Sequence, residues 1–84
     1  MTEQETLTFQ QVVKILTPYV KNPAALEQVA ASTNILEDLK VNSARLVDVV
    51  LAFEDEFDIE IADEDVDKVN TVGDCVSLIL QKAG

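Results

Sequence analysis

Ser43 is the residue whose position points most directly to chemistry. It opens an acidic amphipathic helix expected over Ser43 to Phe57, directly after Asn42, so its hydroxyl lies at the solvent end of a rigid element. A helix N-terminus favours a negative phosphate through its dipole and its unpaired amide groups. The sequence therefore predicts that Ser43 is a good attachment point for a group bound through phosphate.

The residue types that are missing exclude most enzyme chemistry. The chain has no histidine, a single cysteine, Cys75, and two glycines, Gly73 and Gly84. Without histidine the usual general base and the commonest transition-metal ligand are both absent, and one cysteine cannot build a zinc site. No glycine-rich loop is present to hold a nucleotide. These absences rule out a Ser-His-Asp triad, and we expect no catalytic residue and no metal ligand.

Length and charge indicate one small acidic domain. We expect a single domain over residues 1–84, with residues 1–7 as a flexible N-terminus. The net charge of -10 should repel nucleic acid and anionic membranes and should suit basic protein partners. The simpler interpretation of the charge is a solvated surface. The acidic start, the lone cysteine and the lack of a membrane-length apolar run favour a cytoplasmic monomer without membrane insertion.

Apolar residues recur at helical spacing in three separate segments, which predicts an all-α fold. The first helix is expected to start at Thr8, capped with the help of Gln11, and to kink or end at Pro18. A short helical turn over residues 24–31 should follow, with Leu26, Val29 and Ala30 facing inward. The next loop should be pinned to the core by three apolar side chains, Ile35, Leu36 and Leu39.

The expected helix over Ser43 to Phe57 carries two apolar faces. One faces the core and comprises Leu46, Val49, Val50, Phe53 and Phe57. The second comprises Ala44, Val47 and Leu51, and the acids Asp48, Glu54 and Asp55 surround it. An apolar strip bordered by acids is typical of a partner-binding helix, because burial supplies affinity and charge supplies orientation. The alternative is that the strip packs under the first helix or the long loop.

Two further helices are predicted after Ile61. Asp63 should cap a short helix containing Val66 and Val69, and Thr71 should cap the last helix with Asp74 at its third position. The buried stripe of this last helix is expected to comprise Val72, Cys75, Val76, Ile79 and Leu80. The sequence therefore predicts a bundle of three main helices plus one short helix, with Cys75 as a small core residue.

Several segments between Ile35 and Leu80, taken in order, resemble the acyl carrier protein family. They are Glu37-Asp38-Leu39 before the serine, the acidic helix ending at Phe57, the Ile59-Glu60-Ile61 exit, the acidic short helix, and Lys68-Val69 leading to Thr71-Val72. The resemblance covers more than half of the chain. It implies the bundle fold of that family and a carrier function without catalysis.

The resemblance also assigns site residues and partners. It implies that Ser43 carries 4'-phosphopantetheine, a flexible arm donated by coenzyme A that holds an acyl group as a thioester for enzymes of fatty-acid, lipid or secondary metabolism. The partners would be a phosphopantetheinyl transferase and acyl-transferring or synthase enzymes with basic docking surfaces. Their contacts would be Ala44, Arg45, Val47, Asp48, Leu51, Glu54 and Asp55, and the acyl chain would lie among Leu46, Val50, Phe53, Ile61 and Val69.

The departures from the family cluster around the attachment site. The usual sequence is Gly-x-Asp-Ser-Leu-Asp, whereas this chain has Lys40-Val41-Asn42-Ser43-Ala44-Arg45. Arg45 places a positive charge two residues after the serine, which would repel the basic surface that recognises an ordinary carrier. We interpret the chain as a specialised carrier with dedicated partners. An aminoacyl or peptidyl carrier, or an unmodified helical adaptor, remains an alternative.

A calcium site is a further alternative. Asp63, Asp65, Asp67, Thr71 and Asp74 have the spacing of an EF-hand loop. Lys68, however, stands where that loop needs glycine for its sharp turn, and Asp74 stands where it needs a bidentate glutamate. We interpret the spacing as accidental.

Overall fold

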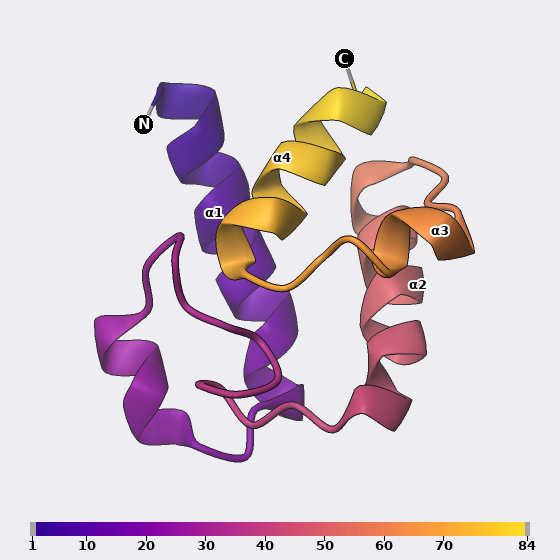
Figure 1. Ribbon diagram of the computed structural model, residues 1–84. Helices are drawn as coiled ribbons and strands as arrows, with labels where there is room; N and C mark the ends of the chain where they lie inside the picture. Colours follow the sequence, from indigo (N-terminus) through magenta and orange to yellow (C-terminus); the bar gives the residue numbers. More distant parts are fainter. Residues whose placement is uncertain (1, 84) are drawn as a thin grey trace.

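The computed structural model describes residues 2–83 and confirms the predicted all-α fold. Figure 1 shows that α1 and α4 cross next to each other and that α2 and α3 lie on the right of the molecule. The long connection lies at the lower left, beside the C-terminal part of α1. The four α-helices and three short 3₁₀ helices are α1 (Glu3–Leu16), η1 (Thr17–Tyr19), η2 (Pro23–Gln28), η3 (Ser43–Arg45), α2 (Leu46–Phe57), α3 (Asp63–Val66) and α4 (Val72–Ala83).

The first helix begins earlier than the sequence predicted. Thr2 is the cap: the Glu5 amide donates to the Thr2 hydroxyl at 3.2 Å, and the Thr2 amide donates to the Glu5 carboxylate at 3.0 Å. The predicted start at Thr8 is wrong, because Thr8 is buried within the helix. The expected flexible segment is therefore helical from Glu3 onward, since this reciprocal capping pair outweighs the polar character of the segment.

The end of α1 follows the prediction. The helix stops at Leu16, and Pro18 lies in the 3₁₀ turn η1. Proline has no amide hydrogen and clashes with the preceding turn of an α-helix, so the tighter turn replaces it. Thr17 supports this exit, because its hydroxyl donates to the Val13 carbonyl at 2.7 Å.

The long connection between η2 and η3 is held by three buried side chains, Ile35, Leu39 and Val41. Ile35 and Leu39 are buried as predicted, whereas Leu36 is 39% exposed and Ala30 is exposed, so the inward placement of these two was wrong. The Asn34 side chain explains the turn, because it accepts from the amides of Leu36 and Glu37 and so directs Leu36 outward.

The connection is also tied to the start of α4. The Ile35 amide donates to the Asn70 carbonyl and the Val72 amide donates to the Thr33 carbonyl, each at 3.0 Å, forming an isolated antiparallel bridge. The core packs between α1, α2, α4 and this connection, and its buried residues are Val12, Leu16, Ile35, Leu39, Val41, Val49, Phe53, Val72, Cys75, Val76 and Ile79. Four residues of the predicted α4 stripe are thus buried, and the fifth, Leu80, is half-buried and packs against this core.

Helix α3 starts one residue away from the predicted cap. Asp63 is its first residue rather than its cap, because the Ala62 amide donates instead to the Asp65 carboxylate at 3.2 Å. The predicted cap of α4 is confirmed. The Asp74 amide donates to the Thr71 hydroxyl at 3.1 Å, and the Thr71 amide donates to the Asp74 carboxylate at 3.0 Å. Over residues 2–83, every helix is too short or too polar to cross a membrane.

Candidate functional site

Ser43 opens an exposed turn that the two preceding residues hold in place. Val41 is buried, and Asn42 caps the N-terminus of the turn, because its side chain accepts from the Ala44 amide at 2.9 Å. The Asn42 carbonyl also accepts from the Arg45 amide at 2.8 Å. The first turn is therefore a 3₁₀ turn and the α-helix starts at Leu46, not at Ser43 as predicted. Within residues 2–83, the Ser43 hydroxyl makes no hydrogen bond to the protein.

The apolar strip of Ala44, Val47 and Leu51 faces solvent. Val47 is 65% exposed and Leu51 is 56% exposed, so the alternative in which the strip packs under the first helix or the long loop is wrong. Val47 and Leu51 continue into an open groove of about 420 Å³ between α2 and α3, whose other lining residues are Val50, Glu54, Ile61, Asp63, Val66 and Asp67. The groove thus extends the strip from Val47 and Leu51 with further apolar side chains, and the carboxylates of Glu54, Asp63 and Asp67 also line it.

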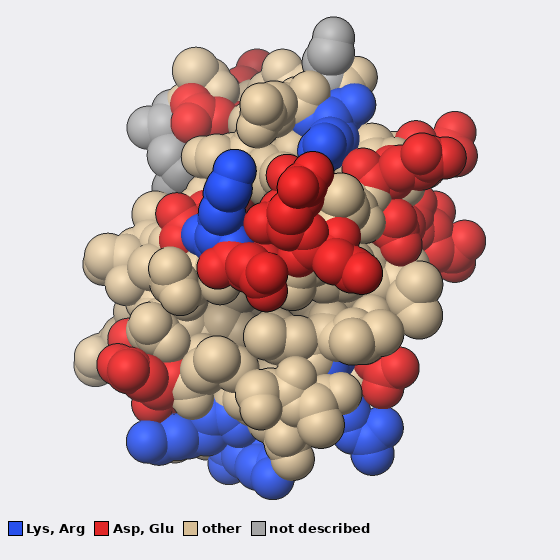
Figure 2. Space-filling model, turned by 45° about the vertical axis from the view of Figure 1, so that its right-hand side comes forward, with Lys and Arg blue, Asp and Glu red and all other residues tan. Residues whose placement is uncertain are grey.

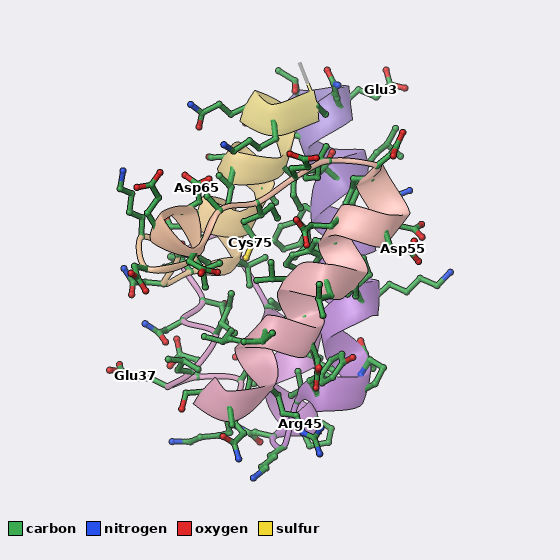
Figure 3. The ribbon with its side chains drawn as sticks, turned by 90° about the vertical axis from the view of Figure 1, so that its right-hand side faces the viewer. Glu3, Glu37, Arg45, Asp55, Asp65 and Cys75 are labelled. Carbon is green, nitrogen blue, oxygen red and sulfur yellow. The ribbon has the colours of Figure 1, made fainter. Side chains whose placement is uncertain are left out.

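The three acids around the strip have different surroundings. Asp48 pairs with Arg45 at 3.2 Å on the surface, one turn after the serine. Glu54 accepts from the Ile61 amide at 2.8 Å and so fastens the α2–α3 loop to α2, a structural contact that the sequence did not reveal. Asp55 is exposed, and Figure 3 shows it at the end of α2 remote from Arg45. Only Asp55 lacks a protein partner among these three.

A small apolar cavity lies behind α2. It has a volume of about 20 Å³, room for about one water molecule. All five residues that the family resemblance assigned to the acyl chain line it, together with Ile35, Val49, Val66, Cys75, Leu78 and Ile79. Leu78 was missed by the sequence analysis, although its spacing of three residues from Cys75 places both on neighbouring parts of one helix face.

Cys75 is a core residue, as predicted. It is buried, and burial first and the neighbouring Asp74 charge second raise the pKa of its thiol to about 12. The thiolate is therefore scarce at neutral pH, and Cys75 is not a nucleophile in the folded protein.

The aspartates with EF-hand spacing do not converge. Asp65 accepts from the Ala62 amide and pairs with Lys82 of α4 at 3.0 Å, and Lys82 is the main cause of its lowered pKa. Asp74 is held by the amides of Asn70 and Thr71. Among residues 2–83, no cluster of three or more acidic or cysteine side chains is placed to hold a metal ion. Asp65 and Asp74 instead make capping contacts at the starts of α3 and α4, so their EF-hand-like spacing does not form a metal site.

An accessible serine on a rigid turn, an apolar strip beside it and an apolar cavity behind it define a carrier scaffold. The comparisons with known proteins agree. A family model described as "Phosphopantetheine attachment site" matches residues 21–79, a stretch that includes Ser43. The chain belongs to the acyl carrier protein family, and it is therefore a carrier rather than an enzyme. The cofactor of this family is covalently attached 4'-phosphopantetheine.

Two curated relatives are acyl carrier proteins. That of Picosynechococcus sp. is 41% identical over 58 residues, which cover 69% of this chain and 72% of the relative. That of Thermotoga maritima is 44% identical over 57 residues, which cover 68% of this chain and 70% of the relative.

Two solved structures share the fold. The crystal structure of an acyl carrier protein from Thermotoga maritima has a TM-score of 0.79 at 26% identity, covering 95% of this chain and 91% of that one. The structure of an acyl carrier protein from Enterococcus faecalis has a TM-score of 0.76 at 36% identity, covering 98% of this chain and 99% of that one.

Proposed function

We propose that the protein is a monomeric, single-domain carrier that holds an acyl group on a 4'-phosphopantetheine arm attached to the Ser43 hydroxyl. The observation that carries the proposal is the exposed Ser43 hydroxyl, free of protein hydrogen bonds, on a turn fixed by Asn42 and by the buried Val41. A hydroxyl in this position is open to modification, and the fixed turn makes it a defined point of attachment.

The residues around Ser43 fit this arm. A phosphodiester at Ser43 would carry a negative charge next to the first amides of η3 and α2, and Arg45 lies two residues further along the turn. The arm itself supplies the thiol that binds the acyl group. The protein's residues supply position only: Asn42 holds the turn, and Val41 anchors it to the core.

The apolar strip supplies a docking surface for the enzymes that use the arm. Ala44, Val47 and Leu51 would be buried by a partner, while Asp48, Glu54 and Asp55 lie around them and orient it. Glu54 is half-buried and bonded to Ile61, so it contributes to this surface from a fixed position. The partners are the transferase that installs the arm and enzymes that load or unload the acyl group.

The cavity favours an acyl cargo over an aminoacyl one. Every side chain that lines it is apolar or, in Cys75, a protonated thiol. An ammonium group in such a lining would lose its hydration without a partner, whereas a hydrocarbon chain would gain contacts. A cavity of about 20 Å³ is too small for a chain, so loading requires α3 to move away from α2 and α4. The partner enzymes would determine the metabolic pathway and the length of the acyl group.

The experiment is the mass of the purified protein before and after incubation with coenzyme A, magnesium and a transferase encoded by the same genome. We expect one added phosphopantetheinyl group on the wild type. If no transferase adds it and protein purified from its native host also lacks it, the chain is an unmodified adaptor on a carrier fold.

A further inference from the structure

Three of the six cationic side chains gather at the end of the molecule that carries Ser43. They are Lys21, Lys40 and Arg45, and we call them the basic collar. Asn22 fixes the relation of the two lysines, because its side chain donates to the Asp38 carbonyl at 3.3 Å and its amide donates to the Leu39 carbonyl at 3.4 Å. Lys21 and Arg45 line one open hollow of about 390 Å³, together with Pro18, Tyr19, Val20 and Asn42.

Two carboxylates close to the collar in the sequence are engaged by other groups. Asp38 accepts from the Asn34 amide at 2.8 Å, and Asp48 pairs with Arg45 at the surface. Figure 3 shows Glu37 and Arg45 pointing in different directions. Because the pair between Arg45 and Asp48 is exposed, it is weak, and Arg45 remains available to a stronger partner.

The opposite end of α2 has the reverse charge. Figure 2 shows acidic side chains gathered from the centre to the upper right, next to some basic ones, whereas other basic side chains gather at the lower end, where α2 begins, with acidic side chains to either side of them. The acidic end is formed by Glu54, Asp55, Glu56, Asp58 and Glu60. A protein with a net charge of -10 thus presents a basic end around its attachment serine.

Lys40, one of the three collar residues, has an unfavourable backbone conformation. Its φ of 59° is in the left-handed region, where glycine is favoured and a side chain is strained. The Lys40 side chain is exposed, so packing does not explain its presence. A strained residue with no packing role suggests that its charge is used.

We propose that the basic collar docks onto a carboxylate-lined protein surface at the mouth through which the arm enters a partner. The partner is identified as an enzyme that handles Ser43, so this step rests on the proposed function. Such a partner presents acidic side chains to the collar and basic side chains to the acidic end of α2 near Asp55. Because the two ends of α2 have opposite charge, this complementarity fixes the direction in which α2 lies on the partner. Extended polyanions are disfavoured by the net charge.

The first experiment measures kcat/KM for arm addition with a panel of transferases at low salt and at about 0.15 M salt. The variant is Lys21→Glu with Arg45→Glu, and the matched control is Lys14→Glu with Lys68→Glu, which changes charge equally away from the collar. For the transferase that loads the wild type fastest, we expect the collar variant to lose about tenfold at low salt and less at high salt, since steering changes rates by about 10-fold or more. The control should change by about twofold or less.

A transferase that prefers ordinary carriers should respond in the opposite direction, loading Arg45→Asp faster than the wild type. Equal losses in the collar variant and the control, or gains with every transferase, would overturn the inference. So would vesicles of phosphatidylglycerol that bind the wild type but not the collar variant, because they would assign the collar to a lipid surface.

The second experiment does not depend on loading. Two nitroxide radicals of similar shape, one carboxylate and one ammonium, are added separately to the unmodified ¹⁵N-labelled protein, and amide proton relaxation is measured. The ratio of anionic to cationic relaxation should be about threefold or more higher at Lys21, Lys40 and Arg45 than at Asp55 and Glu56, as expected for a local potential of a few kT. A ratio at the collar as low as that at Asp55 overturns the inference even if Ser43 is loaded. A protein that shows the high ratio but is never loaded refutes the proposed function instead.

Discussion

Two helix starts in this chain look alike in sequence and differ in what their hydroxyl does. Asn42-Ser43 precedes α2 and Asn70-Thr71 precedes α4. At α4 the Thr71 hydroxyl accepts from the Asp74 amide, and the Asp74 carboxylate accepts from the amides of Asn70 and Thr71. At α2 the asparagine side chain caps instead, and the Ser43 hydroxyl is left exposed.

The two helix starts also differ in how far other segments of the chain cover them. The start of α4 is packed against the long connection, because the Gly73 amide donates to the Ala31 carbonyl at 2.8 Å. The start of α2 has no such cover, since Ser43, Ala44 and Arg45 are all exposed. The start of α4 is therefore packed and contributes to stability, whereas the start of α2 is open to solvent and to partner molecules. Each prediction below tests one side of this division.

The largest effect is expected from Gly73→Ala. An added Cβ would lie 2.9 Å from the Ala31 carbonyl oxygen and 3.1 Å from the Ala31 side chain, too close for either to remain in place. We expect a loss of about 1–3 kcal/mol in the free energy of unfolding, measured by urea denaturation. Ala44→Leu, a larger addition at the exposed start of α2, should change it by less than about 0.5 kcal/mol. Equal effects would show that the two starts are not packed differently.

Removing the capping hydroxyl should come next. Thr71→Ala loses the bond to the Asp74 amide and should destabilise the protein by about 1 kcal/mol, whereas Ser43→Ala should change stability by less than about 0.5 kcal/mol. Thermal unfolding followed by circular dichroism measures both. If Ser43→Ala were the more destabilising change, its hydroxyl would have a structural role that the structure does not show.

Acid should weaken the α4 start through Asp74. The backbone hydrogen bonds from Asn70 and then Thr71 lower the pKa of Asp74 from its ordinary value of 3.8. A lowered folded-state pKa means that the unfolded state binds the proton more tightly, so this contribution is complete above about pH 4 and is lost as the pH falls through the folded-state value. Asp74→Asn should flatten the fall in melting temperature below about pH 4.

The control for Asp74→Asn is Asp55→Asn, which removes the same charge from the exposed end of α2. This variant should keep the steeper fall of the wild type, since Asp55 makes no capping contact to the helix start. A slope that flattens equally in both variants would attribute the acid sensitivity to net charge rather than to the cap.

The smallest effect, and the only stabilising one, is expected from Lys40→Gly. Glycine adopts the φ of 59° without steric cost, and the gain is partly offset by the greater freedom of glycine in the unfolded chain. We expect the free energy of unfolding to rise by about 0.5–1 kcal/mol. Lys40→Ala removes the same charge but keeps a Cβ, so it should not stabilise. A gain of equal size with alanine would mean that charge, and not backbone strain, opposes lysine there.

The sequence was sufficient where a pattern is local. Helical spacing placed the core of α2 and α4, and the Thr71 to Asp74 spacing predicted the cap of α4, because both depend on residues within one or two turns. The start of α1 was missed for a local reason as well, since Thr2 with Glu5 forms a second capping pair upstream of Thr8. The exposure of Val47 and Leu51 was left open by the sequence, because it depends on what the long connection covers.

The features that the sequence did not reveal depend on contacts between distant segments. The tie from Glu54 to the Ile61 amide and the pair between Asp65 and Lys82 need the α2–α3 loop and α4 to be in place. The approach of Lys21 to Lys40 depends on two hydrogen bonds of Asn22 across the long connection. Surface charges carry no periodic signal, so such a cluster becomes visible only in three dimensions.

The most direct measurement of the central claim compares Ser43→Ala with Thr71→Ala, two hydroxyl deletions at similar helix starts. Each variant and the wild type are incubated with coenzyme A, magnesium and the transferase that loads the wild type, and the intact masses are recorded. Wild type and Thr71→Ala should each gain one phosphopantetheinyl group, and Ser43→Ala should gain none. A Ser43→Ala protein that still gains the group, or a folded Thr71→Ala protein that does not, would contradict the assignment of Ser43 as the attachment site.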